Sequence, residues 1–407
     1  MKSYRLQYSL FTLALFISLV LSSCKGKEDY EPAGFISMDQ VTRLELSPSS
    51  PVLACDGKST LTFRVEAYYE VDGKEAKMLQ DRIPADQITV TSSDGKSINL
   101  SEGYSTTSSA DQITFKAEYK GAKSIASAPI AVELIAAEGE AYTPITVPVR
   151  FYLMYTGQEK AFADRYPDSH FSDMLARLNS VLDGTIETNI PRAFSANAGV
   201  TFKLEGVERI ELGVADADDT NSYIKDYLID RPEEVLHIWV NEHQGWYDDS
   251  YEPKATFGNP DDIPMPKYQG LTHISDISEM GKLQQQYMGI TMRFGELTPD
   301  NAGKHFEFII GKFYGLLSPG KDMREHEYGA EVPDVDLVPD TYSYNIVTGY
   351  STIKEARQSG VAQSIYYQST NIMERDRSAA QIISRGQIAR MRQVMQDVPF
   401  RQQGFKN

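Results

Sequence analysis

The chain has 407 residues, of which 40 are Lys or Arg and 57 are Asp or Glu, so its formal net charge is −17 at pH 7. Nucleic-acid binding needs basic patches that displace counterions from phosphates, and this acidic balance argues against it. The length predicts two or three domains, and a hydrophobic content of 41% is enough for ordinary cores.

The chain begins with the pattern of an export signal. Lys2 and Arg5 precede an apolar run over residues 10–21, which is shorter than the roughly 20 residues that a membrane-spanning helix needs. The run ends in Leu21-Ser22-Ser23-Cys24, which resembles the lipobox of bacterial lipoproteins. The resemblance implies a signal peptide over residues 1–23 and a lipid on Cys24 that anchors the chain to a membrane. The alternative is an ordinary signal peptide followed by a chance cysteine.

Residues 24–38 are predicted to form a tether. The segment Lys25-Gly26-Lys27-Glu28-Asp29-Tyr30-Glu31 resembles the surface-export tag of lipoproteins from Bacteroides-type Gram-negative bacteria. The resemblance implies an outer-membrane lipoprotein, exposed on the cell surface. Once Cys24 carries a lipid, Cys55 has no partner in the chain, so no disulfide is predicted and Cys55 is expected to be a small buried hydrophobe.

Residues 39–150 carry short segments in which apolar and polar residues alternate. This period of two predicts half-buried strands, and the Asp-Gly pairs at 72–73 and 94–95 predict turns between them. About seven short strands are expected, which favours an immunoglobulin-like β-sandwich that serves as a spacer or binding platform. The clearest strand segments are 61–67, 87–91, 112–119 and 129–134.

Residues 151–407 mix strand and helix signals, which predicts an α+β domain with a mixed sheet. A helix is predicted over 171–182, where apolar residues recur at spacings of three and four. Long loops are expected at 244–270 and 318–345. The other predicted strands are 148–155, 200–204, 235–240 and 287–294, and the other helices are 222–229, one starting near residue 300, and 387–396.

The order of segments in this second domain resembles zinc metallopeptidases of the pappalysin and cytophagalysin type, within the metzincins. The resemblance extends over roughly residues 150–400. It implies an active-site-type helix over Phe308–Ser318, a following acidic segment, and a Met-turn at Asn371-Ile372-Met373. The remaining landmarks are the strands 236–241 and 289–291, the acidic segment 334–341, and the closing helix around 387–392.

This sequence departs from the metzincin motif at every ligand position. The motif H-E-x-x-H-x-x-G-x-x-H places two histidines on one helix face, a glutamate that activates water, and a glycine turn before the third histidine. Aligning the turn glycine with Gly315 puts Phe308 and Lys312 at the first two histidines, Ile309 at the glutamate and Ser318 at the third histidine. Phe has no donor atom and Lys stays an ammonium near pH 7. The resemblance therefore implies a metzincin-like domain without zinc or catalysis.

Two other metal sites remain open as alternatives. None of the six histidines pairs with another at i, i+4, but His305, Glu307 and His326 flank the degenerate motif and could bind zinc through nitrogen and oxygen atoms. Oxygen ligands from Asp334, Asp336 and Asp340 would suit a structural calcium ion.

The leading interpretation is a lipid-anchored envelope binding protein with a catalytically dead metallopeptidase-like domain. Its ligand would be a peptide, a protein or a glycan, and its contact with the membrane would be the lipid on Cys24. One alternative is an active zinc-dependent metallopeptidase with non-standard ligands. The other is a purely structural envelope lipoprotein.

Overall fold

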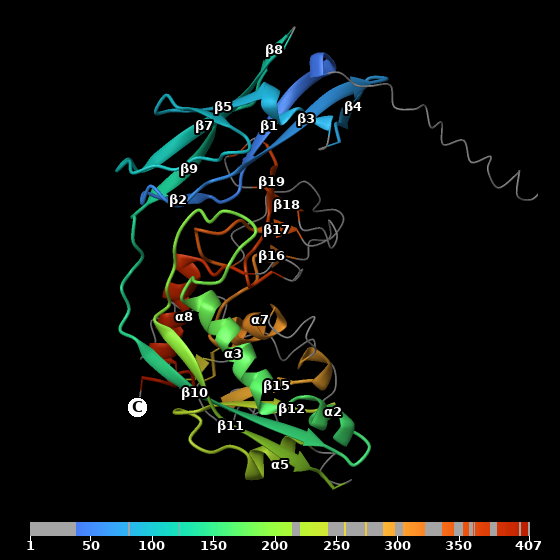
Figure 1. Cartoon of the computed structure of the whole chain (residues 1–407), viewed down its shortest axis with the longest axis vertical. Coiled ribbons are helices and arrows are strands. Elements are labelled where there is room, and N and C mark those ends of the chain that lie inside the picture. Colours follow the sequence, from blue (N-terminus) through green and yellow to red (C-terminus); the bar gives the residue numbers. More distant parts are fainter. Residues whose placement is uncertain are drawn as a thin grey trace, which may run out of the picture.

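The computed structural model describes residues 38–79, 82–121, 123–213, 220–242, 256–257, 273–274, 288–297, 304–321, 336–345, 353–357, 361, 363–374, 381–398 and 400–405. A strand-rich unit lies at one end of the molecule and a unit of helices and strands at the other (Figure 1). The predicted combination of α and β elements is therefore confirmed. The predicted signal peptide, Cys24 and nearly all of the tether lie outside the described residues. Within those residues, no helix has the length and apolar character needed to cross a membrane.

The N-terminal unit consists of two sheets over one hydrophobic core. Strands β5 (Ile88–Ser92) and β9 (Ile130–Ile135) alternate buried and more exposed residues, as the sequence pattern predicts. The immunoglobulin-like identity of this unit stays a prediction. One sheet has the order β1 (Val41–Pro48), β3 (Phe63–Val71), β4 (Lys74–Lys77), and the other has the order β2 (Val52–Ala54), β9, β7 (Gln112–Lys120), β5, β6 (Ser97–Asn99), with β8 (Ser124–Ala126) beside β7.

The C-terminal unit is built on a parallel sheet in the order β11-β10-β12-β15. The strands are β10 (Ile145–Tyr155), β11 (Val200–Glu211), β12 (Leu236–Val240) and β15 (Gly289–Met292). All five residues of β12 are buried, as expected for a strand covered on both faces. Strand β10 runs through the predicted domain boundary at residues 150 and 151.

Helices cover both faces of this parallel sheet. Alternate residues of β10 enter different cores: Phe151 and Leu153 pack with the helices of one face, and Tyr152 and Met154 pack on the other. Helices α3 (Asp168–Leu182), α7 (Lys304–Phe313) and α8 (Arg385–Asp397) lie on the first face, and α5 (Thr220–Tyr227) lies on the second (Figure 1). The short helices α2 (Lys160–Arg165) and η6 (Phe294–Leu297) also belong to this unit, and η1 (Met38–Gln40) and η3 (Ala85–Gln87) belong to the N-terminal one.

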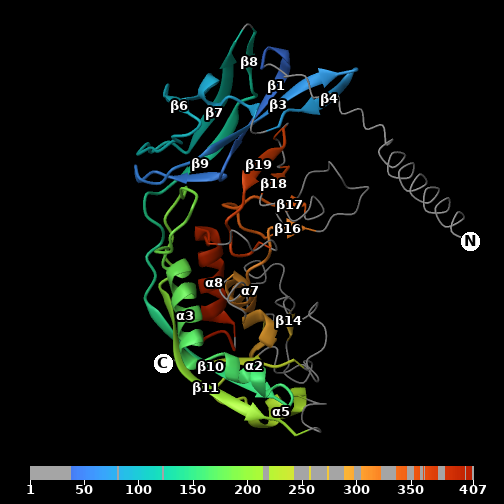
Figure 2. The ribbon, with the colours of Figure 1, turned by 45° about the vertical axis from the view of Figure 1, so that its right-hand side comes forward.

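A third sheet lies between the two units (Figure 2). It has the order β16 (Gly320–Lys321), β17 (Tyr344–Asn345), β18 (Ile353–Ala356), β19 (Ile365–Gln368), and it contains residues from the segment 318–345 that we expected to be a loop. The short strands β13 (Thr256–Phe257) and β14 (His273–Ile274) form a separate parallel pair.

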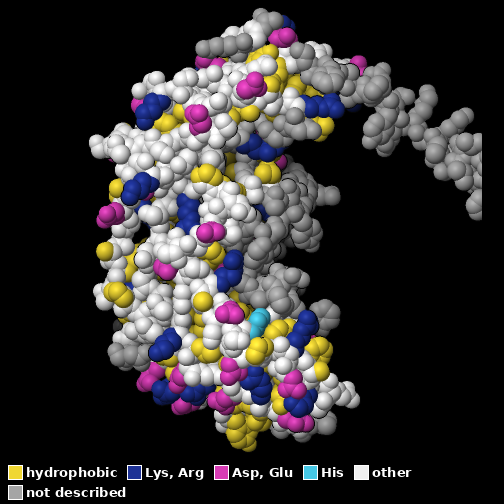
Figure 3. Space-filling view, in the orientation of Figure 1, with side chains coloured by type: hydrophobic (Ala, Val, Ile, Leu, Met, Phe, Trp, Pro, Cys, Tyr) yellow, Lys and Arg dark blue, Asp and Glu magenta, His cyan; other side chains and the backbone are white. Residues whose placement is uncertain are grey.

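The described surface of the C-terminal unit carries interleaved opposite charges. In Figure 3, acidic and basic side chains intermix at the lower end of the molecule. Arg150 and Arg231 both pair with Glu205, at 2.7 and 3.2 Å. Glu205 is the extra residue of a bulge in the edge strand β11, where the register with β10 shifts. A bulge and charged side chains protect an exposed sheet edge from pairing with other chains.

Candidate functional site

The helix that we predicted to correspond to the metzincin active-site helix is part of the hydrophobic core. Helix α7 runs from Lys304 to Phe313, so it begins four residues before the predicted segment Phe308–Ser318 and ends five residues before that segment does. Phe308 is 6% exposed and Ile309 is 2% exposed, and both pack in the core between the parallel sheet and its helices. The two positions that align with the first histidine and the glutamate of the motif are thus buried apolar residues.

Phe308 and Lys312 share one face of α7. The Nζ atom of Lys312 lies 5.6 Å from the centroid of the Phe308 ring, as the i, i+4 spacing on a helix requires. A cation over an aromatic face is an attractive arrangement. The face that would carry two imidazoles in a metzincin carries a ring and an ammonium here.

Gly315 ends the helix in a left-handed turn, with φ of +82°. Its N–H donates to the Lys312 carbonyl at 3.0 Å, and the N–H of Leu316 donates to the Gly311 carbonyl at 2.9 Å. These two bonds form a Schellman cap, for which glycine is favoured.

The turn after the helix makes two further contacts. Arg390 of α8 donates through Nε to the Gly315 carbonyl at 2.7 Å. Ser318 follows the turn, and its Oγ accepts a bond from the N–H of Gly320 at 3.3 Å.

Met373 packs directly against α7. It is fully buried, and a Cβ atom placed on Gly311 would lie 2.4 Å from its Sδ atom. The turn that carries it is fixed by Asn371, whose Oδ1 accepts a bond from the N–H of Met373 at 2.8 Å and whose amide exchanges two bonds with Gln387 of α8. The segments 308–318, 371–373 and 387–392 therefore meet, although they are far apart in the sequence.

The alternative zinc set is only partly described. Glu307 is fully buried, and its carboxylate lies 3.0 Å from Nε of Arg177, which joins α7 to α3. The side chain of His305, and His326, lie outside the described residues. In the part of the chain that the structure describes, no three His, Cys, Asp or Glu side chains come together in a group that could hold a metal ion.

The aspartates of the acidic segment accept hydrogen bonds from the protein. Asp336 is 1% exposed and accepts a bond from Oγ1 of Thr341 at 2.6 Å. Asp340 accepts bonds from Oγ of Ser384 and the N–H of Gly386, both at 2.7 Å, at the start of α8. A carboxylate at a helix N-terminus satisfies free N–H groups and interacts favourably with the helix dipole. Asp334 lies outside the described residues, so the calcium site stays a prediction.

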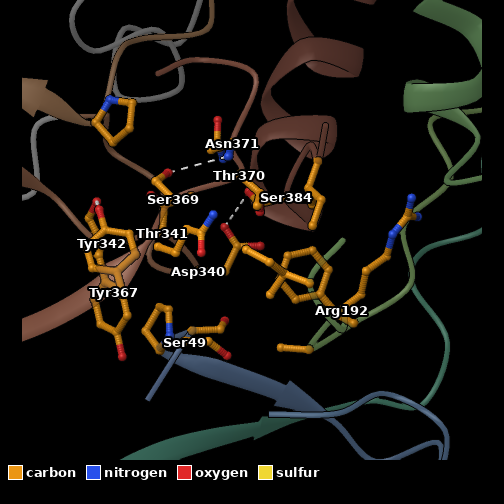
Figure 4. Close-up of a pocket in the computed structure, with 18 of the residues that line it drawn as sticks. Ser49, Arg192, Asp340, Thr341, Tyr342, Tyr367, Ser369, Thr370, Asn371 and Ser384 are labelled. Atoms are coloured by element: carbon orange, nitrogen blue, oxygen red, sulfur yellow. Dashed lines mark hydrogen bonds between the residues drawn. The ribbon is translucent and has the colours of Figure 1, made fainter. Parts of the chain in front are cut away.

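A pocket that the sequence did not predict lies at the junction of the two units (Figure 4). Its volume is about 80 Å³. Its walls come from the loop after β1, the segment 190–194, the segment 340–342 and the segment 367–374. Phe194 and Pro191 supply apolar surface, and Ser49, Thr370 and Asn371 supply polar groups. No local motif signals such a pocket, because its walls converge from segments that are far apart in the sequence.

Comparisons with known proteins find similarity in solved structures only. No protein-family model matches the sequence, and no curated protein sequence matches it. The fold is similar to mature mirolysin of Tannerella forsythia in complex with a cleaved peptide, with a TM-score of 0.43 and 17% identity over 64% of this chain and 96% of that chain. It is also similar to a Tannerella forsythia promirolysin mutant (TM-score 0.39, 16% identity, 64% of this chain and 84% of that chain) and to mirolysin in complex with compound 9 (0.40, 15%, 64% and 96%). Similarity at this level assigns no site residue, activity or substrate to this chain.

Proposed function

We propose that this chain is a lipid-anchored protein of the bacterial outer membrane that binds a target without cleaving it. Its C-terminal unit is a metallopeptidase-like domain that has lost catalysis, and its N-terminal unit is an immunoglobulin-like sandwich next to the membrane. The lipid on Cys24 would provide the membrane attachment, and the charged residues after it would direct the protein to the cell surface.

The observation that carries the proposal is the burial of Phe308 and Ile309 in the core of the C-terminal unit. A zincin needs a nitrogen donor and a carboxylate at these positions, since the metal binds the first and the second activates water. An aromatic ring and an aliphatic side chain can do neither. Because apolar replacements of a polar site pack well, the fold can persist without the chemistry.

The residues present do not fit a zinc ion at the positions of the metzincin motif. Lys312 carries a positive charge near pH 7 and would repel a cation at the second ligand position. The Ser318 hydroxyl is a weak ligand that already accepts a bond from Gly320. No catalytic step through zinc follows from these side chains.

The junction pocket is the place where we propose that a target is held. About 80 Å³ is room for one side chain or a small chemical group rather than a whole ligand. Its combination of apolar walls and hydroxyl groups suits the anchoring of a peptide, a protein segment or a glycan whose remaining part stays on the surface.

Turnover and binding can be separated with the lipid-free chain over residues 25–407. Fluorescently quenched casein and a mixed peptide library are incubated with the protein, with and without added zinc, and products are followed by fluorescence and mass spectrometry. We expect no cleavage above the buffer control in either condition. Zinc-dependent products that disappear on addition of a chelator would contradict the proposal.

Peptides retained intact by the immobilised protein would support the proposal. We expect the substitution Thr370→Trp, which fills the pocket, to abolish this retention.

A further inference from the structure

We infer that the N-terminal sandwich is not a movable spacer but is locked to the C-terminal unit, so that the two unfold as one cooperative body. Separate domains usually meet through modest polar interfaces and a flexible linker. Here two sheet edges of the sandwich pack against segments of the C-terminal unit, the core of the sandwich continues into that unit, and the linker is bound to helix α8.

Two sheet edges of the sandwich are covered by segments from later in the chain. Beside β2, the N–H of Ala54 donates to the Ala193 carbonyl at 2.8 Å, and the N–H of Thr60 donates to the Arg192 carbonyl at 2.7 Å. Beside β1, the segment around β19 lies against Ser47, whose Oγ accepts a bond from the N–H of Tyr366 at 2.9 Å. Edges used in this way cannot recruit a strand from another protein.

The two units also share a hydrophobic core. The cluster that contains the sandwich residues Leu46, Val65 and Phe115 extends without a break into residues that the sequence assigns to the second domain. All of these added residues are at most 9% exposed: Ala193, Phe194, Tyr342, Ala356, Ile365 and Tyr367. Separating the units would expose this apolar surface to water, which is unfavourable in proportion to its area.

The linker between the units is held along helix α8 by two arginines. Arg385 donates to the carbonyls of Ala136, Ala137 and Ser195 at 2.6, 3.0 and 2.7 Å. Two turns further along α8, Arg392 donates to the carbonyl of Thr143 at 2.9 Å and stacks near the Tyr142 ring. Figure 1 shows the linker running down the side of the molecule towards β10. With both ends bound to one helix, the linker cannot serve as a hinge.

The unchanged chain already contains residues that report on the unfolding of each unit. Both tryptophans, Trp239 and Trp246, belong to the C-terminal part of the sequence, and Cys55 of the sandwich is the one thiol in residues 25–407. Urea unfolding is followed by tryptophan fluorescence and by pulsed alkylation of Cys55, with hydrogen exchange in β7 as a second sandwich readout. We expect the urea midpoints of all three signals to coincide.

The substitution Arg385→Ala tests the coupling itself, because Arg385 lies in the C-terminal unit and the Cys55 probe lies in the sandwich. We expect it to lower the midpoints of both probes by the same amount. Arg165→Ala, an exposed arginine on α2 that is remote from the sandwich, is the control and should leave both midpoints unchanged. Separate midpoints in the unchanged chain, or a shift confined to tryptophan fluorescence in Arg385→Ala, would overturn the inference.

Discussion

At the scale of single residues, His237 shows how far burial can shift the pKa of a side chain. The sequence indicated only that this residue lies in a strand. Its side chain is fully buried between Tyr152 and Trp239, with Nδ1 3.1 Å from the Tyr152 hydroxyl and Nε2 2.5 Å from the Asp230 carbonyl. Burial disfavours the charged imidazolium and lowers the pKa of His237 from 6.5 to about 4. The imidazole is therefore neutral in the folded protein near pH 7.

This shift predicts a loss of stability in mild acid. The folded-state pKa lies below the unfolded value, so the unfolded chain binds the proton first. The stabilising contribution is complete above about pH 6.5 and is lost as the pH falls towards about 4, by about 3 kcal/mol in total. Denaturant unfolding between pH 4 and pH 8 measures it, with His237→Gln as the comparison. The decline in the free energy of unfolding should be steeper in the unchanged protein, and equal declines in both proteins would contradict the assignment.

For two carboxylates, the sequence identified a chemically important residue but not the partner that it binds. The sequence placed Glu307 and Asp340 near candidate metal sites because carboxylates are metal ligands. In the folded chain, Glu307 pairs with Arg177 across two helices, and Asp340 holds the first turn of α8. These partners are 130 and 44 or more positions away in the sequence, so no local pattern could identify them.

At the scale of elements, long periodic segments were predictable and short ones were not. Helices α3 and α8 and strands β7, β10 and β12 lie where apolar spacing predicted them. The third sheet was missed because its strands have two to four residues, too few to show a period. The capping box at Ser384 and Gln387 is a start signal for α8 that the sequence does carry, and the structure has both of its bonds.

The contact between α7 and the turn at Met373 gives a prediction at this scale. Gly311→Ala places a methyl group against the buried Met373 Sδ atom. Overpacking of this kind costs about 1–3 kcal/mol, while alanine gains up to about 1 kcal/mol over glycine in a helix. We expect a net destabilisation of up to about 2 kcal/mol, measured by urea unfolding.

The same substitution in a Met373→Ala background separates crowding from other effects. Truncating Met373 removes the obstructing atom, so Gly311→Ala should then be neutral or stabilising. The double-mutant cycle isolates this pairwise free energy. An equal loss of stability in both backgrounds would show that Met373 does not lie against Gly311.

At the scale of the whole molecule, the two units share one hydrophobic core, and we propose that the metallopeptidase-like unit has lost its catalytic chemistry. Gly311 lies against Met373, and Arg390 of α8 donates to the Gly315 carbonyl, so three of the segments that the sequence analysis named as landmarks lie close together. The junction pocket and the shared core could not be predicted, because they depend on how two units pack rather than on any motif.

The most direct measurement is the zinc content of the chain over residues 25–407 after dialysis against trace zinc, by elemental analysis. We predict less than about 0.1 zinc per chain, since a protein zinc site needs deprotonated donor ligands and Phe308, Ile309, Lys312 and Ser318 provide none. A value near one zinc per chain would contradict it, and His305, Glu307 and His326 would then be the first ligands to replace.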